Sequence, residues 1–128
     1  MIQIALLGLG TVGSGVVRLL ELNGAEISKR LGQDIIVKRI LVKDLCKRRA
    51  VPKGSILTDN ISEILDDRDI DIIVELMGGE KPAVTYIREA LGKGKHVVTA
   101  NKEVIAKHGQ ELLKLSEENG VNLLFEAS

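Results

Sequence analysis

Apolar residues along this chain follow two patterns that alternate. Short apolar runs rich in β-branched residues are typical of buried strands, and they occur at residues 2–7, 35–42, 56–57, 70–77, 96–99 and 121–125. Between these runs, apolar residues recur at helical spacing and predict helices over residues 12–22, 61–65, 82–91 and 103–119. Strands that alternate with helices are joined by right-handed crossovers. The pattern therefore predicts an α/β fold with a doubly wound, mostly parallel sheet in the strand order 3-2-1-4-5-6.

Polar stretches and turn residues mark the ends of these elements. The polar residues 23–34 predict a connection after the first helix, and the basic residues 43–55 predict an irregular connection after the second strand. Pro82 stands where the first turn of a helix tolerates proline, and Gly120 stands in the position of a left-handed C-cap. The 128 residues contain no repeat or linker and predict one compact domain.

Composition narrows the classes of function. Lys and Arg together count 18, as do Asp and Glu, so a neutral chain has no global electrostatic basis for binding nucleic acid or a membrane. An aromatic content of 2% also disfavours a base-stacking surface. Cys46 is the single cysteine, which excludes an internal disulfide and a cysteine-cluster metal site and favours a reducing, cytoplasmic compartment. No apolar run reaches the ~18 residues of a membrane span.

A glycine-rich motif follows the first predicted strand and opens the first predicted helix. It consists of Gly8, Leu9, Gly10, Thr11, Val12 and Gly13. In this context the first glycine allows a tight turn, the second lets a pyrophosphate approach the backbone, and the third lets the helix pack on the strand. A glycine turn needed only for packing is the alternative. The motif lacks the lysine and Ser/Thr of a phosphotransferase loop, so it predicts dinucleotide binding.

The segment after the second strand bears on which dinucleotide is bound. An acidic residue there accepts hydrogen bonds from the adenosine ribose, whereas a basic residue pairs with a 2′-phosphate. Asp44 is the acidic candidate, but Lys43 precedes it and the segment also contains Lys47, Arg48, Arg49 and Lys53. This basic excess favours NADP, with some use of NAD, although a solvated loop without a specific role would look the same.

Two further segments fall at the ends of strands on the other side of the predicted sheet. Met77 and Gly78 follow the fourth strand, where a glycine turn lets backbone approach the cofactor or simply connects strand to helix. Thr99, Asn101 and Lys102 follow the fifth strand, with Asn101 suited to the N-cap. A cation at a helix N-terminus opposes the helix dipole. Lys102 is therefore better explained by a ligand or proton-transfer role than by an exposed bystander position.

Five segments together resemble the nicotinamide-binding half of homoserine dehydrogenase. They are GLGTVGSGVV, ILVKDL, VELMGG, HVVTANKEV and LLFEAS, in that order along the chain. The resemblance implies a Rossmann domain over residues 1–128 of an oxidoreductase that interconverts homoserine and aspartate 4-semialdehyde with NADP or NAD, in threonine and methionine biosynthesis. It places Lys102 beside the nicotinamide as an aid to proton transfer, Lys43 at the 2′-phosphate, and the glycine motif at the pyrophosphate.

The resemblance stops where the family continues into a second domain. That domain supplies the substrate site, a metal-ion loop and the contacts of the homo-oligomer, and none of its residues can be assigned here. We therefore expect an isolated dinucleotide-binding domain that is inactive by itself, with no metal ligand, nucleic acid or membrane among its partners. A free-standing CoA- or NAD-binding module is the alternative, but such a module has no need of Lys102.

Overall fold

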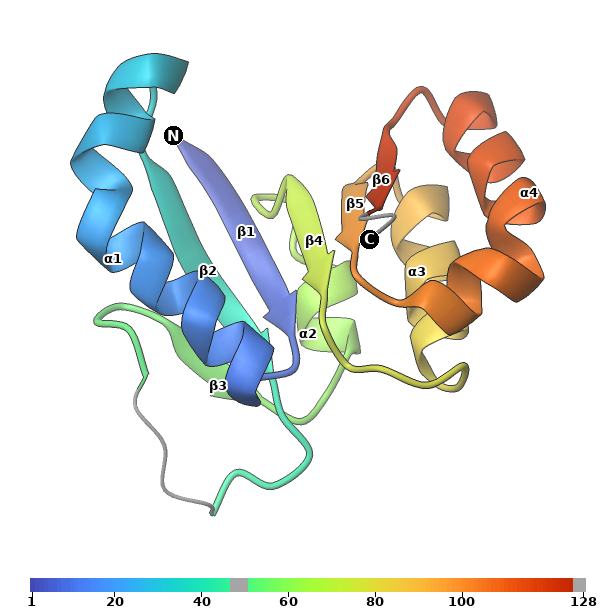
Figure 1. Ribbon diagram of the computed structural model, residues 1–128, viewed down its shortest axis with the longest axis horizontal. Coiled ribbons are helices and arrows are strands. Elements are labelled where there is room, and N and C mark those ends of the chain that lie inside the picture. The colour runs from blue at the N-terminus through green and yellow to red at the C-terminus, as the bar shows by residue number, and fades with distance from the viewer. Residues whose placement is uncertain (47–50, 126–128) are drawn as a thin grey trace.

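The computed structural model describes residues 1–46 and 51–125, except for the side chains of Thr11 and Val12. Six strands form one parallel sheet in the order β3-β2-β1-β4-β5-β6, as predicted (Figure 1). The strands are β1 (Ile2–Leu7), β2 (Ile35–Leu41), β3 (Ile56–Thr58), β4 (Ile72–Glu75), β5 (His96–Thr99) and β6 (Leu123–Phe125). The helices are α1 (Thr11–Leu31), α2 (Ser62–Leu65), α3 (Ala83–Gly92) and α4 (Lys102–Glu118).

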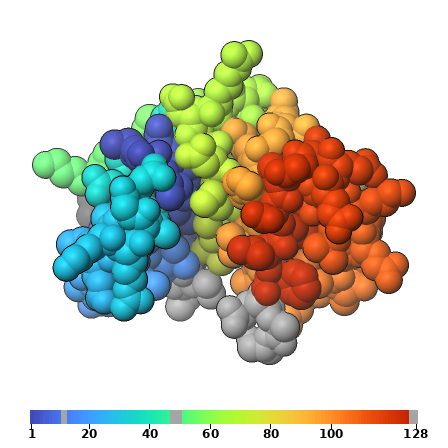
Figure 2. Space-filling view, turned by 90° about the horizontal axis from the view of Figure 1, so that it is seen from above, coloured from blue at the N-terminus to red at the C-terminus, as the bar shows by residue number. Residues whose placement is uncertain are grey.

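The sheet separates two apolar cores because alternate strand residues point to opposite faces. Ile4 and Leu6 of β1 pack with Val17 of α1 on one face. Ala5 and Leu7 of the same strand belong to the larger core on the other face, which contains residues of α2, α3 and α4. In Figure 2 the blue amino-terminal part and the red carboxyl-terminal part lie on opposite sides of the green central segments. Both faces of β1 are thus buried, as in a doubly wound sheet, whereas Ile72 and Val74 of β4 are only partly buried on the α1 face.

The first helix is longer than predicted. The sequence pattern predicts its end near residue 22, whereas α1 continues through the polar residues to Leu31. An ion pair between Glu26 and Arg30, with nitrogen and oxygen 2.9 Å apart, supports this last part, and Gly32 ends the helix with a left-handed φ of 72°. Apolar periodicity fades here because the end of α1 extends past the sheet (Figure 1) and has little core to cover.

Other boundaries shift by smaller amounts. Residues 70–77 predict one strand, but β4 occupies only the middle of that range, although the amides of Asp71 and Leu76 still donate hydrogen bonds to the carbonyl oxygens of Gln3 and Leu7 in β1. Pro82 is the N-cap of α3 rather than a residue of its first turn. Gly120 has a φ of 66° after α4, as its C-cap prediction requires. No helix in the described part of the chain is long and apolar enough to cross a membrane.

Candidate functional site

The carboxyl ends of the central strands surround a pocket of about 560 Å³. Its walls come from the turn after β1, the end of β2, the turn after β3 and the connection from β4 to α3. The lining residues are Gly8, Leu9, Gly10, Leu41, Val42, Lys43, Asp59, Leu76, Met77, Pro82 and Tyr86. In an open parallel sheet, ligands bind at this edge where the strand order reverses, which here is between β1 and β4. A larger hollow of about 940 Å³ lies at the opposite, amino edge and includes Met1, Asp71 and His96, away from the glycine motif.

The first and third motif glycines are required by close contacts within the turn. Gly8 has a φ of 109°, which residues with side chains rarely adopt. A Cβ atom on Gly13 would lie 2.6 Å from the carbonyl oxygen of Gly8, so α1 can approach β1 this closely only because Gly13 has no side chain. A Cβ on Gly10 would meet nothing within 4 Å, and Gly10 lines the pocket. The middle glycine therefore leaves room on the pocket side.

The amino terminus of α1 is open toward the same pocket. Its N-cap is Gly10, no side chain caps it, and its first turn contains no acidic residue. The first amide groups of a helix have no partner within the helix, and the helix dipole gives this end a partial positive charge. The amino terminus of this 21-residue helix has no side-chain cap and begins at Gly10, which leaves space on the pocket side. Such a helix start suits the pyrophosphate of a dinucleotide.

Lys43 and Asp44 take different positions after β2. Lys43 lines the pocket. The Oδ1 atom of Asp44 accepts a hydrogen bond of 2.8 Å from the amide of Cys46, so this carboxylate is engaged in its own turn and is not among the pocket residues. Lys47, Arg48 and Arg49 of the basic segment lie outside the described residues. Among the described residues, the acid that lines the pocket is Asp59, in the turn after β3.

The opposite side of the site is built from buried polar side chains. Glu75, the last residue of β4, has an exposed fraction of 0%. Its Oε2 atom accepts a hydrogen bond of 2.7 Å from the amide of Met77, and its Oε1 atom accepts one of 2.5 Å from the hydroxyl of Thr99. The Thr99 hydroxyl oxygen in turn accepts a hydrogen bond of 3.0 Å from the amide of Asn101. The ends of β4 and β5 are thereby joined.

Asn101 links this pair of strands to the glycine turn and to α4. Its Oδ1 atom accepts a hydrogen bond of 3.1 Å from the amide of Val104, which makes it the N-cap that the sequence predicts. Its Nδ2 group donates a hydrogen bond of 2.5 Å to the carbonyl oxygen of Gly79. Gly78 and Gly79 both have positive φ values, 74° and 73°, and this turn conformation favours glycine.

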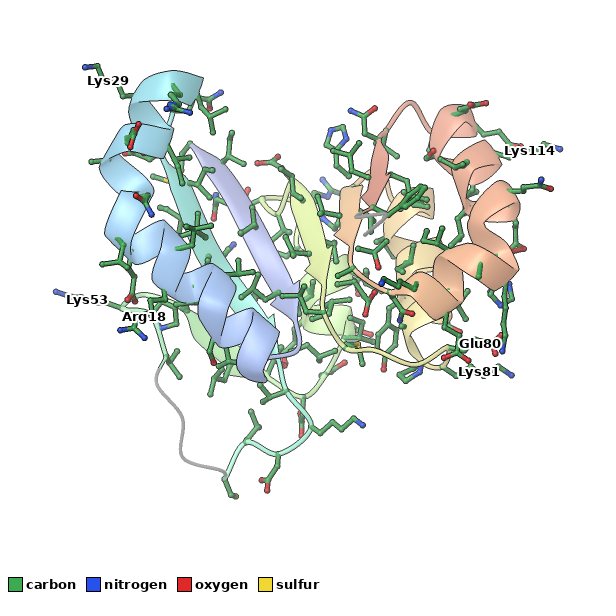
Figure 3. The ribbon with its side chains drawn as sticks, viewed as in Figure 1. Arg18, Lys29, Lys53, Glu80, Lys81 and Lys114 are labelled. Atoms are coloured by element: carbon green, nitrogen blue, oxygen red, sulfur yellow. The ribbon has the colours of Figure 1, made fainter. Side chains whose placement is uncertain are left out.

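Lys102 is the first residue of α4 and is exposed. The next turns of α4 are tied to the same connection through Glu80, which lies below α4 in Figure 3. The Glu80 carboxylate is 2.7 Å from Nε2 of His108 and 3.3 Å from Nζ of Lys107. Hydrogen bonds from His108 and Lys107 lower the pKa of Glu80. The start of α4 is therefore held to the connection between β4 and α3 at two points, through Asn101 and Glu80.

The structure gathers some of the predicted site residues and separates others. Gly8, Leu9, Gly10, Lys43 and Met77 share the pocket wall. Gly78, Thr99, Asn101 and Lys102 lie at the ends of β4 and β5 but do not line the pocket. The side chains of Thr99 and Asn101 are engaged in hydrogen bonds within the protein. The side chains of Thr11 and Val12 lie outside the described residues. Within the described chain, no three His, Cys, Asp or Glu side chains are grouped to hold a metal ion.

Sequence reasoning missed several residues of this region, three of which carry polar groups. Asp59 and Tyr86 line the pocket, and Glu75 organises its far side. The position of Asp59 directly after a strand was a usable signal, because the ends of parallel strands meet at one edge. A glutamate within an otherwise apolar run was a usable signal for Glu75, since a charged residue is almost never fully buried without partners. Tyr86 lies in the middle of α3 and carries no such signal.

Comparisons with known proteins agree with this geometry. The model of the family described as homoserine dehydrogenase, NAD binding domain, matches residues 8–126. The homoserine dehydrogenase of Bacillus subtilis is 44% identical over 129 residues, which cover 99% of this chain and 30% of that protein. The enzyme of Lactococcus lactis is 42% identical, with coverages of 99% and 30%.

Solved structures show the same relation. The crystal structure of the Staphylococcus aureus homoserine dehydrogenase superposes with a TM-score of 0.92 and 52% identity, covering 98% of this chain and 32% of that one. The enzyme of Thiobacillus denitrificans gives a TM-score of 0.92 and 46% identity, with coverages of 98% and 29%. The chain thus spans less than a third of the length of these relatives.

Proposed function

The chain belongs to the homoserine dehydrogenase family, as its NAD-binding domain, and from this premise we propose that its pocket binds NADP in preference to NAD. The observation that carries the proposal is the position of Lys43 on the pocket wall while the Asp44 carboxylate is bonded to its own turn. A lysine at the end of the second strand suits a 2′-phosphate, and an acid directed into the pocket there would suit the free ribose hydroxyl.

The rest of the cofactor fits the two sides of the carboxyl edge. The pyrophosphate belongs at Gly10 and the uncapped start of α1. The nicotinamide belongs across the reversal of strand order, near Met77 and Gly78. When bound, the cofactor supplies a hydride or accepts one.

Within the complete enzyme, we assign this domain to the interconversion of homoserine and aspartate 4-semialdehyde. Reduction of an aldehyde needs a proton donor close to the reacting oxygen. The exposed ammonium group of Lys102, on the first turn of α4, supplies or relays that proton.

The substrate itself needs partners that this domain does not offer. Homoserine carries an amino and a carboxylate group, and charged groups must be held by fixed partners before they react within about 3–3.5 Å of the cofactor. We assign these partners to the part of the relatives that the chain does not span, and we expect the 128-residue chain alone to bind cofactor without turning over homoserine.

Titration calorimetry with NADP and NAD tests the proposed preference. Lys43→Ala should weaken NADP binding about 10- to 100-fold, the value of one charged hydrogen bond, and should leave NAD binding nearly unchanged. Lys53→Ala is the matched control, because Lys53 belongs to the same basic segment but does not line the pocket, and it lies at the left edge of the molecule in Figure 3. Tighter binding of NAD by the unmodified chain, or an unchanged ratio in Lys43→Ala, would contradict the proposal.

A further inference from the structure

Glu75 occupies a fully buried position, where an apolar residue would be expected if the position served only to pack the core. It ends β4 with an exposed fraction of 0% and is one of the largest fully buried side chains of the described chain. Burial of a carboxyl group is costly unless hydrogen bonds replace its contacts with water. Both oxygens of Glu75 have such bonds, and both bonds lead to segments that carry predicted site residues.

The bonds of Glu75 are part of a closed ring. One side leads through the amide of Met77 along the glycine turn to the carbonyl oxygen of Gly79. From there the ring passes through the side chain of Asn101 to its amide, and then through the Thr99 hydroxyl back to Glu75. The amide of Ala100 also donates a hydrogen bond of 3.3 Å to the carbonyl oxygen of Glu75. The glycine turn and the start of α4 therefore cannot move independently while the ring is intact.

We propose that Glu75 is the positioning residue for the nicotinamide end of the site. It holds the turn at Gly78 and the first turn of α4, which carries Lys102, in one fixed arrangement. This inference rests on the proposed function, because it assumes that the nicotinamide lies between these two segments. The adenosine side depends on Gly8, Gly10 and Gly13, which belong to a different turn and are not members of the ring.

The separation of the two sides allows a differential test on this chain. NADP and 2′-phospho-ADP-ribose share the adenosine, the 2′-phosphate and the pyrophosphate, but the second lacks the nicotinamide ring. Glu75→Gln keeps the size of the side chain, yet its amide nitrogen cannot accept a hydrogen bond, so one of the two donors at Met77 and Thr99 loses its acceptor. Titration calorimetry should show NADP binding about tenfold weaker and binding of the fragment within about twofold of the unmodified chain.

Two further variants keep the test decisive. Thr99→Val removes the hydroxyl from the other side of the ring at nearly equal volume and should reproduce the pattern, even if Glu75→Gln does not fold. Glu111→Gln is the control, because this glutamate of α4 pairs with Arg88 of α3, away from the ring, and the change should alter neither affinity. A readout without ligand is the hydrogen exchange of the Met77 and Asn101 amides, which should quicken in both ring variants and not in Glu111→Gln.

The outcomes separate the two proposals. Equal weakening of NADP and the fragment in the ring variants would make Glu75 a residue of general stability and overturn the inference. Unchanged affinity for NADP in both ring variants would also overturn it. If the unmodified chain binds NADP no more tightly than 2′-phospho-ADP-ribose, the nicotinamide ring makes no contact with the site, and this result would overturn the inference as well. Binding of neither ligand by the unmodified chain would instead refute the proposed function on which the inference rests.

Discussion

The two sides of the carboxyl-edge pocket are built from different materials. On the side of β1 and α1, the site is formed by backbone groups that come close together because glycines have no side chains. The close approach of Gly13 to Gly8 is the example. On the side of β4, β5 and α4, the same task falls to buried side chains that bond to one another, with Glu75 and Thr99 at the centre. The first side depends on residues close in sequence, and the second on residues 24 positions apart.

We relate this difference to what each side is proposed to hold. A pyrophosphate is charged and is recognised by amide groups at a helix N-terminus, which need only close access. A nicotinamide ring and a substrate must be held at a defined distance and orientation. That precision requires locked side chains supported by hydrogen bonds from neighbouring groups. Four predictions test whether the two sides act separately.

The largest effect is expected at Lys102. In the full-length enzyme, Lys102→Ala should lower turnover by about 100- to 10,000-fold if Lys102 is the proton-transfer group that we propose, while the affinity of the 128-residue chain for NADP changes little. Steady-state kinetics and titration calorimetry measure the two quantities. Lys114→Ala, at the far end of α4 in Figure 3, is the control and should leave both unchanged. A rise only in the Michaelis constant for the cofactor would make Lys102 a cofactor anchor.

Gly13 tests the side of the pocket built from backbone. Gly13→Val places a Cβ atom about 2.6 Å from a backbone oxygen, so α1 must shift away from β1. Overpacking of this kind costs about 1–3 kcal/mol of unfolding free energy, and the displaced helix start should also bind NADP poorly. Urea denaturation and calorimetry measure the two effects. Gly15→Ala, where a Cβ meets nothing within 4 Å, should instead stabilise by about 0.5–1 kcal/mol and bind normally.

The two sides also differ in how well the sequence predicts them, because one depends on local contacts and the other on contacts between distant residues. The turn from Gly8 to Gly13 is predictable because its glycines act on their own backbone and on the helix that begins within the motif. The N-cap role of Asn101 is predictable for the same local reason. The bond from Glu75 to Thr99 is not, because it depends on the register of two parallel strands, in which these residues face each other. The length of α1 also escapes prediction, because its last turns cover no core.

A substitution at Gly10 distinguishes an effect on cofactor binding from an effect on stability, on the side of the pocket formed by β1 and α1. Its φ of −84° suits any residue, so Gly10→Ala should change the unfolding free energy by about 1 kcal/mol or less. The added methyl group would meet no protein atom within 4 Å, but it would sit on a residue of the pocket wall, where we propose that the pyrophosphate binds. We expect NADP binding to weaken about tenfold or more, the equivalent of one charge-assisted hydrogen bond. Calorimetry beside urea denaturation measures both, and unchanged binding would move the pyrophosphate away from Gly10.

The smallest effect is expected at Asp67, which belongs to neither side of the pocket, so its loss should lower stability and leave NADP binding unchanged. Its Oδ2 atom lies 2.7 Å from Nζ of Lys38 and 3.0 Å from Nε of Arg39. Burial by itself would raise the pKa of this carboxyl, but the hydrogen bonds from Lys38 and Arg39 outweigh burial and lower the pKa from 3.8 to about 2. A carboxyl whose pKa is lowered by folding stabilises the protein above its unfolded pKa.

Asp67→Asn should therefore lower the unfolding free energy by about 1–2 kcal/mol at neutral pH, discounted for partial exposure. Because the stabilisation is present above the unfolded pKa and is lost as the pH falls toward the folded value of about 2, the difference between the two proteins should shrink below about pH 4. Urea denaturation between pH 7 and pH 3 measures it, with Glu26→Gln as the control for an exposed ion pair. A difference independent of pH would mean that Asn loses packing rather than charge. Weakened NADP binding in folded Asp67→Asn would show that the pocket also depends on this distant cluster, contrary to the separation of sides argued above.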